Sequence, residues 1–200
     1  ILAWYASQED AGIYNAVIRL MLILTLPLTL VQTLLTPMSA SLSGEGRLGE
    51  LRSLYQTATR WIFTSMVPIV LAVLLFSDVF LGMVGTDYAE GGDSLALLAA
   101  TLLLAGFANP AGYAVTMAGR SDITLLNSVL CFLTTIGVAL WLIPEFGLLG
   151  AAGARAASLL VNNALTLAQG RWLLGLNPFS LALLKPTLAG ILACASGWWA

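Results

Sequence analysis

The sequence predicts an all-α protein, a polytopic bundle of transmembrane helices, on three observations. Of its 200 residues, 59% are hydrophobic and only 9% are charged, far below the roughly 25% charged residues of soluble domains. Several uncharged stretches are about 20 residues long, enough to cross a hydrocarbon core of roughly 30 Å. The positive charges also fall on alternate connections between the apolar segments, as they do where short cytoplasmic loops collect Lys and Arg.

This alternation also predicts an orientation. Acids are the only charged residues in the first, third and fifth connections, at 9–10, 78–93 and 145. Six of the eight basic residues lie in or beside the second, fourth and sixth connections: Arg47, Arg52, Arg60, Arg120, Arg171 and Lys185. We therefore expect the basic connections to face the cytoplasm, and the chain to be a multi-pass protein of the cell inner (cytoplasmic) membrane.

The first two spans follow from apolar length and from proline positions. Residues 1–6 resemble the last turn of a preceding span, and the first full span covers about 12–42, with Pro27 and Pro37 inside it. The second covers about 50–79 and begins as an amphipathic helix. Proline is tolerated in membrane helices because neighbouring groups satisfy the freed backbone carbonyls.

Four further spans follow. The third covers about 94–118 and contains Asn109-Pro110, which predicts a bend. The fourth and fifth cover about 123–143 and 148–174 and are separated by a Pro-Glu-Phe-Gly turn, and a sixth covers about 181–200. Because the sequence starts and stops inside apolar segments, we expect it to be an internal piece of a larger transporter.

Two arginines lie inside spans rather than in connections. Arg19 and Arg155 each lie about 8 residues into a span, roughly 12 Å deep at 1.5 Å per residue. A charge at the bilayer centre costs about 2.5–3.5 kcal/mol, so such residues usually face a bundle interior or a wet cavity. They are candidate ligands for an anionic substrate. The alternative is that each extends to the interface or anchors a helix, and Asn15 lies one turn from Arg19.

A polar stripe surrounds Arg155. Small residues from Gly147 to Ala157 line the opposite face of that span, as close helix contacts require. The stripe faces either a cavity or a neighbouring helix that it holds by hydrogen bonds. A weaker second stripe follows the first span: Thr25, Thr29, Gln32 and Thr36. The main stripe recurs at steps of three and four residues: Arg155, Ser158, Asn162, Thr166 and Gln169.

Several classes of function are not supported. The chain has no His, and no nucleophile motif or phosphate-binding loop. We therefore expect no enzyme activity, no metal site and no cofactor. No acid lies deep in a span, and no basic patch with interleaved aromatic residues predicts nucleic-acid binding.

Three short motifs resemble one family in their order and spacing. Pro144-Glu-Phe-Gly147-Leu-Leu-Gly150-Ala-Ala resembles the LIP-x-x-G-x-x-G-A-A turn of polysaccharide flippases in the multidrug/oligosaccharidyl-lipid/polysaccharide exporter superfamily. Met117-Ala-Gly119-Arg120 resembles their inner turn M-x-G-R, and Gly12-Ile-Tyr-Asn-Ala16 resembles G-x-Y-x-x-A at the start of a span.

The resemblance implies a fold and a substrate. Residues 1–200 would form the C-terminal lobe of a two-lobed, inverted-V transporter that works by alternating access. Its partners would be membrane lipids, the N-terminal lobe of the same chain and a lipid-linked anionic glycan, the precursor of a polysaccharide. Arg19 and Arg155 would hold the pyrophosphate, with Asn15, Asn162 and Gln169 as further cavity residues. A multidrug or metabolite exporter of the same superfamily and a non-transporting membrane scaffold are the alternatives.

Overall fold

The computed structural model describes residues 8–83 and 85–175. These residues form helices without any strand, which confirms the predicted all-α class. The expected helix end at 1–6, the sixth span at 181–200 and Lys185 lie outside the described residues. In chain order the elements are α2 (Gln8–Leu24), α3 (Leu26–Gly44), α4 (Leu48–Gly82), the 3₁₀-helix η1 (Thr86–Gly91), α5 (Gly92–Met117) and α6 (Ser121–Leu174).

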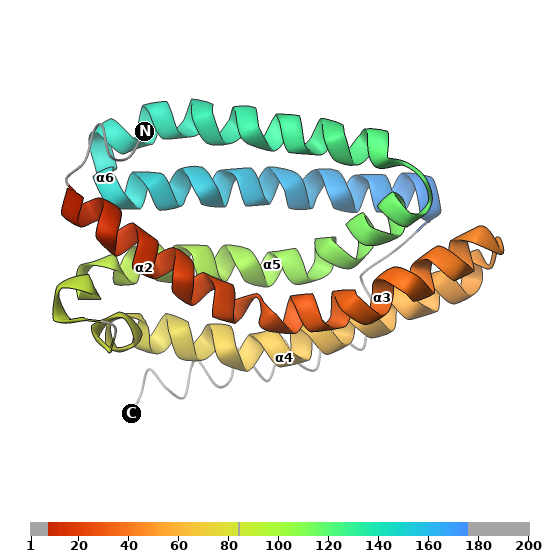
Figure 1. Cartoon of the computed structure of the whole chain (residues 1–200), viewed down its shortest axis with the longest axis horizontal. Coiled ribbons are helices and arrows are strands. Elements are labelled where there is room, and N and C mark those ends of the chain that lie inside the picture. Colours follow the sequence, from red (N-terminus) through yellow and green to blue (C-terminus); the bar gives the residue numbers. More distant parts are fainter. Residues whose placement is uncertain (1–7, 84, 176–200) are drawn as a thin grey trace.

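The helices run up and down along one long axis (Figure 1). One end of the molecule holds the α3–α4 and α5–α6 connections and the C-terminus of α6. The other end holds the start of α2, η1 and the turn inside α6. The connections predicted to share a side of the membrane therefore do lie at the same end of the bundle.

Two proline-linked breaks bend the helices halfway along their length. α2 and α3 meet at 46°, just before Pro27. α5 bends by 50° between Gly106 and Ala108, just before Pro110, as the sequence predicted. A proline removes one backbone donor, and its ring collides with the carbonyl four residues earlier, so a bend on its N-terminal side is the expected result.

The helix α6 is a hairpin of two helices. Its 54 residues are interrupted at Gly147, whose φ of 51° and ψ of −119° are not helical, and the two halves run antiparallel (Figure 1). At Gly150 a Cβ atom would collide with the backbone carbonyl of Leu142. Buried Ala151 and Ala154 pack there against Ala139 and Ile143. The small residues of this stretch therefore allow the close helix contact that the sequence predicted.

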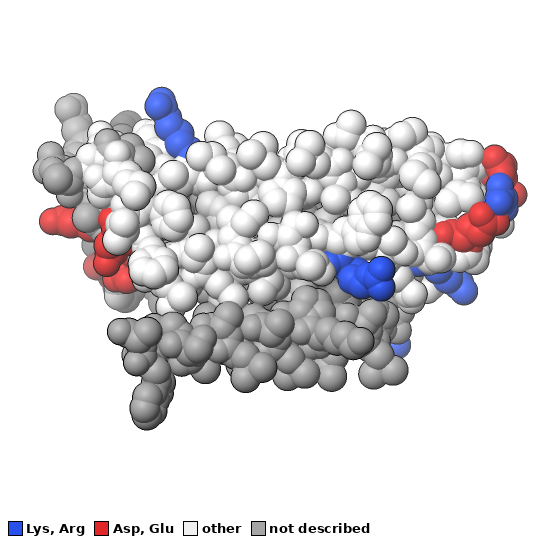
Figure 2. Space-filling model, turned by 90° about the horizontal axis from the view of Figure 1, so that it is seen from below, with Lys and Arg blue, Asp and Glu red and all other residues white. Residues whose placement is uncertain are grey.

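The outer surface is apolar, as in a membrane bundle. Large hydrophobic side chains such as Leu30, Leu125 and Trp141 are more than 60% exposed, and such a surface marks contact with lipid or with another protein. By length and composition, α4 and α6 can cross a membrane, and so can each bent pair when it is counted as one span. Most charged atoms gather at the two ends of the long axis, and the middle of the visible face is largely white (Figure 2).

Arginines organise the basic end of the bundle. Arg47 bridges Glu45 and Glu50 across the α3–α4 turn with N–O distances of 2.9 and 2.6 Å. Its hydrogen bond lowers the pKa of Glu45 below the ordinary value. Arg52 Nε donates to the carbonyl oxygen of Leu174 at 3.2 Å. Since carbonyls at a helix C-terminus lack intrahelical donors, Arg52 ties α4 to the end of α6.

Candidate functional site

A cavity of about 320 Å³ lies where the bent helices face each other. The α2–α3 bend contributes Thr25, Thr29 and Gln32. The second half of α5 contributes Asn109 and Tyr113, directly after its bend. The opposite wall is the second half of α6. Broken helices of this kind form the substrate and ion sites of many transporters, because irregular backbone at membrane depth is tolerated where it lines a cavity.

The wall formed by α6 supplies the site's charge and its amides. Arg155, Asn162 and Asn163 all line the cavity. Arg155 is the only charged residue among the described residues that line it, and no described carboxylate lies within 4 Å of the Arg155 guanidinium. The cavity is therefore electropositive, and it suits an anionic or neutral ligand better than a cation.

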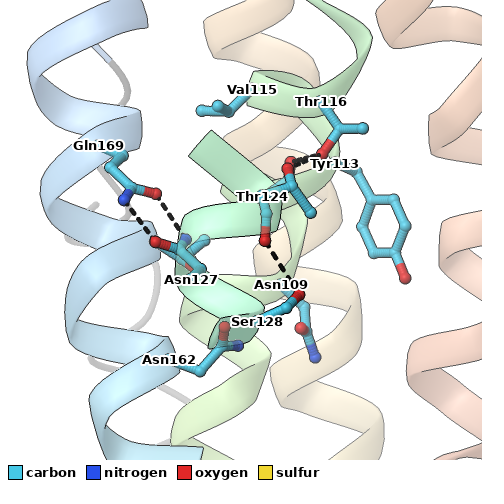
Figure 3. Close-up of a pocket in the computed structure, with 11 residues that line it drawn as sticks. Asn109, Tyr113, Val115, Thr116, Thr124, Asn127, Ser128, Asn162 and Gln169 are labelled. Carbon is cyan, nitrogen blue, oxygen red and sulfur yellow. Dashed lines mark hydrogen bonds between the residues drawn. The ribbon is translucent and has the colours of Figure 1, made fainter. Parts of the chain in front are cut away.

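A second cavity, of about 190 Å³, adjoins the first. Asn109, Tyr113 and Asn162 line both spaces, and Figure 3 shows these three side chains in the smaller one. Its remaining lining includes Thr116 and Thr124, which lie beside the α5–α6 connection. Polar residues therefore continue from the helix bends toward the basic end of the molecule.

The two halves of α6 are held together by a reciprocal amide pair. The Asn127 amide nitrogen donates to Gln169 Oε1 at 2.8 Å, and the Gln169 amide nitrogen donates to Asn127 Oδ1 at 2.7 Å. Figure 3 shows the two side chains facing each other at the wall of the smaller cavity. Gln169, predicted as a cavity residue, therefore lines a cavity while its amide is engaged with Asn127.

The predicted polar stripe divides between two roles. Ser158 Oγ donates to the Cys131 carbonyl at 3.0 Å, and Thr166 is buried, with its methyl group close to Gly112 of α5. Together with Gln169, these residues bind helices to one another, as the alternative interpretation of the stripe held. Arg155 and Asn162 face the larger cavity instead. The stripe is thus both helix contact and cavity wall.

The residues predicted on α2 lie elsewhere. Arg19 and Asn15 are exposed and line neither of these two cavities. The Asn15 amide donates to the carbonyl of Ala11 at 2.9 Å, so it satisfies its own helix rather than holding Arg19. Of the second stripe, Thr25, Thr29 and Gln32 line the larger cavity, while Thr36 Oγ1 donates to the Gln32 carbonyl at 2.9 Å.

Asn163 is a cavity residue that the helical spacing of the stripe did not predict. Its side chain is 5% exposed, and neither its amide nitrogen nor its amide oxygen has a hydrogen-bond partner among the described residues. Steps of three and four residues along the stripe reach Asn162 and pass over its neighbour. The signal available was the Asn162-Asn163 pair itself, because two consecutive amides are unusual in an apolar span and polar groups there need partners.

Comparison with known proteins gives one result. A search of curated proteins and a search of solved structures each found no match. The family model described as MatE matches residues 1–141, which include α2 to α5 and the first half of α6. The chain therefore belongs to the MatE family, whose members are membrane efflux transporters of the multidrug/oligosaccharidyl-lipid/polysaccharide exporter superfamily.

Proposed function

We propose that this chain forms the C-terminal lobe of a transporter that moves a lipid-linked anionic oligosaccharide across the cell inner membrane by alternating access. The observation that carries the proposal is the larger cavity, where Arg155 is the one charged residue among the described lining residues, beside amides, hydroxyls and apolar side chains. A guanidinium offers several donors in a plane and suits phosphate oxygens by geometry.

The charge of the cavity argues against cationic substrates. Organic cations need an acidic or aromatic cage, and the described lining residues include no Asp or Glu. Tyr113 is the single aromatic residue among them. Binding a cation beside the Arg155 guanidinium, which has no carboxylate within 4 Å among the described residues, would add a like-charge repulsion.

An apolar groove supports a lipid-bearing substrate. It encloses about 400 Å³ between α2 and α4, and its lining consists entirely of apolar residues, among them Ile23, Pro68, Ile69 and Phe80. Such a surface favours an acyl or polyprenyl chain, since each buried methylene is worth about 0.8 kcal/mol relative to water. The polar headgroup of such a substrate would occupy the larger cavity, and its apolar tail would lie in the groove on the lobe's outer face.

Arg19 and Asn15 belong to the proposal through the second lobe. Both lie on the exposed face of α2. A charged side chain at this depth of the membrane is stable only beside water or covered by protein. We place the N-terminal lobe over this face, so that Arg19 would complete the cationic wall from the other side of the cleft. Gln169 contributes to the smaller cavity, next to the basic end.

The test is replacement of Arg155 in the full-length transporter. Arg155→Ala should reduce surface polysaccharide by on the order of tenfold, because a charge-assisted hydrogen bond is lost, with unchanged protein in the membrane. Arg155→Lys should retain part of the export. Arg60→Ala is the matched control, since that arginine lines neither cavity. Normal export by Arg155→Ala would refute the proposal.

A multidrug or metabolite exporter is the second candidate, because the matching family model is MatE. This function predicts that loss of the protein increases the cellular accumulation of fluorescent drugs while surface polysaccharide stays normal. An anionic or neutral dye is the informative substrate, given the charge of Arg155. Polysaccharide loss without any change in dye accumulation favours the flippase.

A further inference from the structure

The buried amide of Asn163 is the feature that the proposed function leaves unexplained. Both of its polar atoms lack a partner among the described residues, although the side chain is 95% buried. A buried amide that has lost its water and gained no hydrogen bond destabilises the fold. Such a group marks a site where a ligand or ordered water completes the hydrogen bonding.

Asn127, on the same helix, is a buried asparagine that does have partners. Asn127 is 7% exposed, nearly as buried as Asn163, and its amide nitrogen and oxygen each form a hydrogen bond with Gln169. The chain therefore pairs one buried asparagine and leaves the other open. The open one lines the larger cavity, and the paired one does not.

The amide of Asn163 limits which hydrogen-bonding groups a ligand can carry. An amide presents a donor and an acceptor side by side, so its partner must offer an acceptor and a donor on neighbouring atoms. A carboxylate or phosphate offers acceptors only, and an ammonium offers donors only. Two adjacent hydroxyl groups satisfy both requirements without charge, because each hydroxyl can donate and accept.

The other walls fit the same ligand. Asn109, Asn162 and Gln32 carry further amides with no hydrogen-bond partner among the described residues. Leu98 and Leu102 supply an apolar surface on the α5 side. A few fixed polar groups against an apolar wall are typical of small-molecule sites, and about 320 Å³ lies at the lower end of their range, roughly 300–1,000 Å³.

We propose that this cavity inside the lobe is a sugar subsite, in which Asn163 binds two neighbouring hydroxyls of one sugar ring. The assignment rests on the proposed function, and it adds a separate role to the site: Arg155 attracts the anionic group, and Asn163 selects for hydroxyls. The sugar ring would enter the lobe itself rather than remain in the cleft between lobes.

The experiment separates binding from stability in the full-length protein, kept in a sugar-free detergent. Four methyl glycosides (glucoside, galactoside, mannoside and N-acetylglucosaminide) serve as probes, with thermal unfolding as the readout. At saturation at least one should raise the Tm of the wild type by about 3 °C or more. Asn163→Leu, of similar size, should raise the basal Tm, because an unpaired amide is removed, and should weaken glycoside binding on the order of 10- to 100-fold.

Arg155→Ala distinguishes this inference from the proposed function. It should retain binding of the neutral glycosides while losing binding of inorganic pyrophosphate, and Asn163→Leu should show the reverse. Absence of any glycoside shift in the wild type, or equal shifts in Asn163→Leu, overturns the sugar subsite even if export still depends on Arg155. The flippase proposal is overturned instead if glycoside binding depends on Asn163 but loss of the protein leaves surface polysaccharide normal.

Discussion

At the residue scale, buried amides decide how α6 holds together. The Asn127–Gln169 pair joins the two halves of the hairpin through two hydrogen bonds of 2.8 and 2.7 Å. Asn127 is buried and Gln169 is part-buried, so removing one amide leaves the other without its hydrogen-bond partner. The pair is therefore a structural lock, although it lies beside the polar cavities.

This lock gives a direct prediction. Asn127→Leu should lower the free energy of unfolding by about 1–3 kcal/mol, because the part-buried Gln169 amide loses its hydrogen-bond partner. The double variant Asn127→Leu/Gln169→Leu should recover part of the loss. Thermal unfolding in detergent measures both, and equal stability of the single variant and the wild type would contradict the pairing.

Single residues also show what the sequence could predict about the site. Depth and helical spacing identified Arg155 and Asn162, and both line the larger cavity. The same reasoning grouped them with Ser158, whose hydroxyl donates to the Cys131 carbonyl, and with Thr166, whose methyl group lies close to Gly112 of α5. Spacing identifies a helix face but does not tell whether a cavity or a second helix lies opposite, and this depends on the bends of other helices.

At the element scale, the tight turn at Gly147 creates the α6 hairpin. Its positive φ lies in a region that only glycine enters at low cost. Gly147→Ala should therefore destabilise the protein by about 1–3 kcal/mol. Gly137→Ala is the control, since that glycine is helical and a Cβ there meets no other atom. It should be neutral or slightly stabilising, and equal effects of the two changes would show that the turn is not strained.

The bend in α5 shapes the larger cavity. Pro110 cannot donate to the carbonyl of Gly106, and the helix opens just before it. Pro110→Ala should restore that hydrogen bond, straighten α5 and displace Asn109 from the cavity wall. We expect export to fall while the Tm is unchanged or higher. The control is Pro37→Ala in α3, a proline inside a helix that lines neither cavity nor the apolar groove. Full export by Pro110→Ala would show that the bend is dispensable.

The proline positions illustrate the limit of sequence reasoning at this scale. Pro27 and Pro110 each coincide with a bend, yet α4 departs from helical geometry at Phe76 rather than at Pro68. A proline removes one hydrogen bond wherever it stands, but packing against neighbouring helices decides whether the chain bends there. Helix existence and order follow from composition, whereas bend positions depend on tertiary contacts.

At the scale of the whole molecule, the distribution of charge predicts the membrane orientation. Arg47, Arg120 and Arg171 lie toward one end of the bundle, and Glu145 lies at the other. Single cysteines at Gly49 and Ser121 should react with an impermeant thiol reagent only from the cytoplasmic side, and a cysteine at Glu145 only from the other side. Labelling of Gly49 and Ser121 from opposite faces would contradict the predicted topology.

The central claim is that polar residues of α3, α5 and α6 enclose a wet cavity within an apolar bundle. The most direct test is Asn162→Cys in a full-length variant without native cysteines, treated with a water-soluble thiol reagent. Leu133→Cys, at a position 58% exposed on the apolar surface of α6, is the lipid-facing control. We predict rapid labelling at position 162 and none at position 133. Resistance of both positions, while a cysteine at Ser121 reacts, would show that the stripe is dry helix packing and would contradict a transport site here.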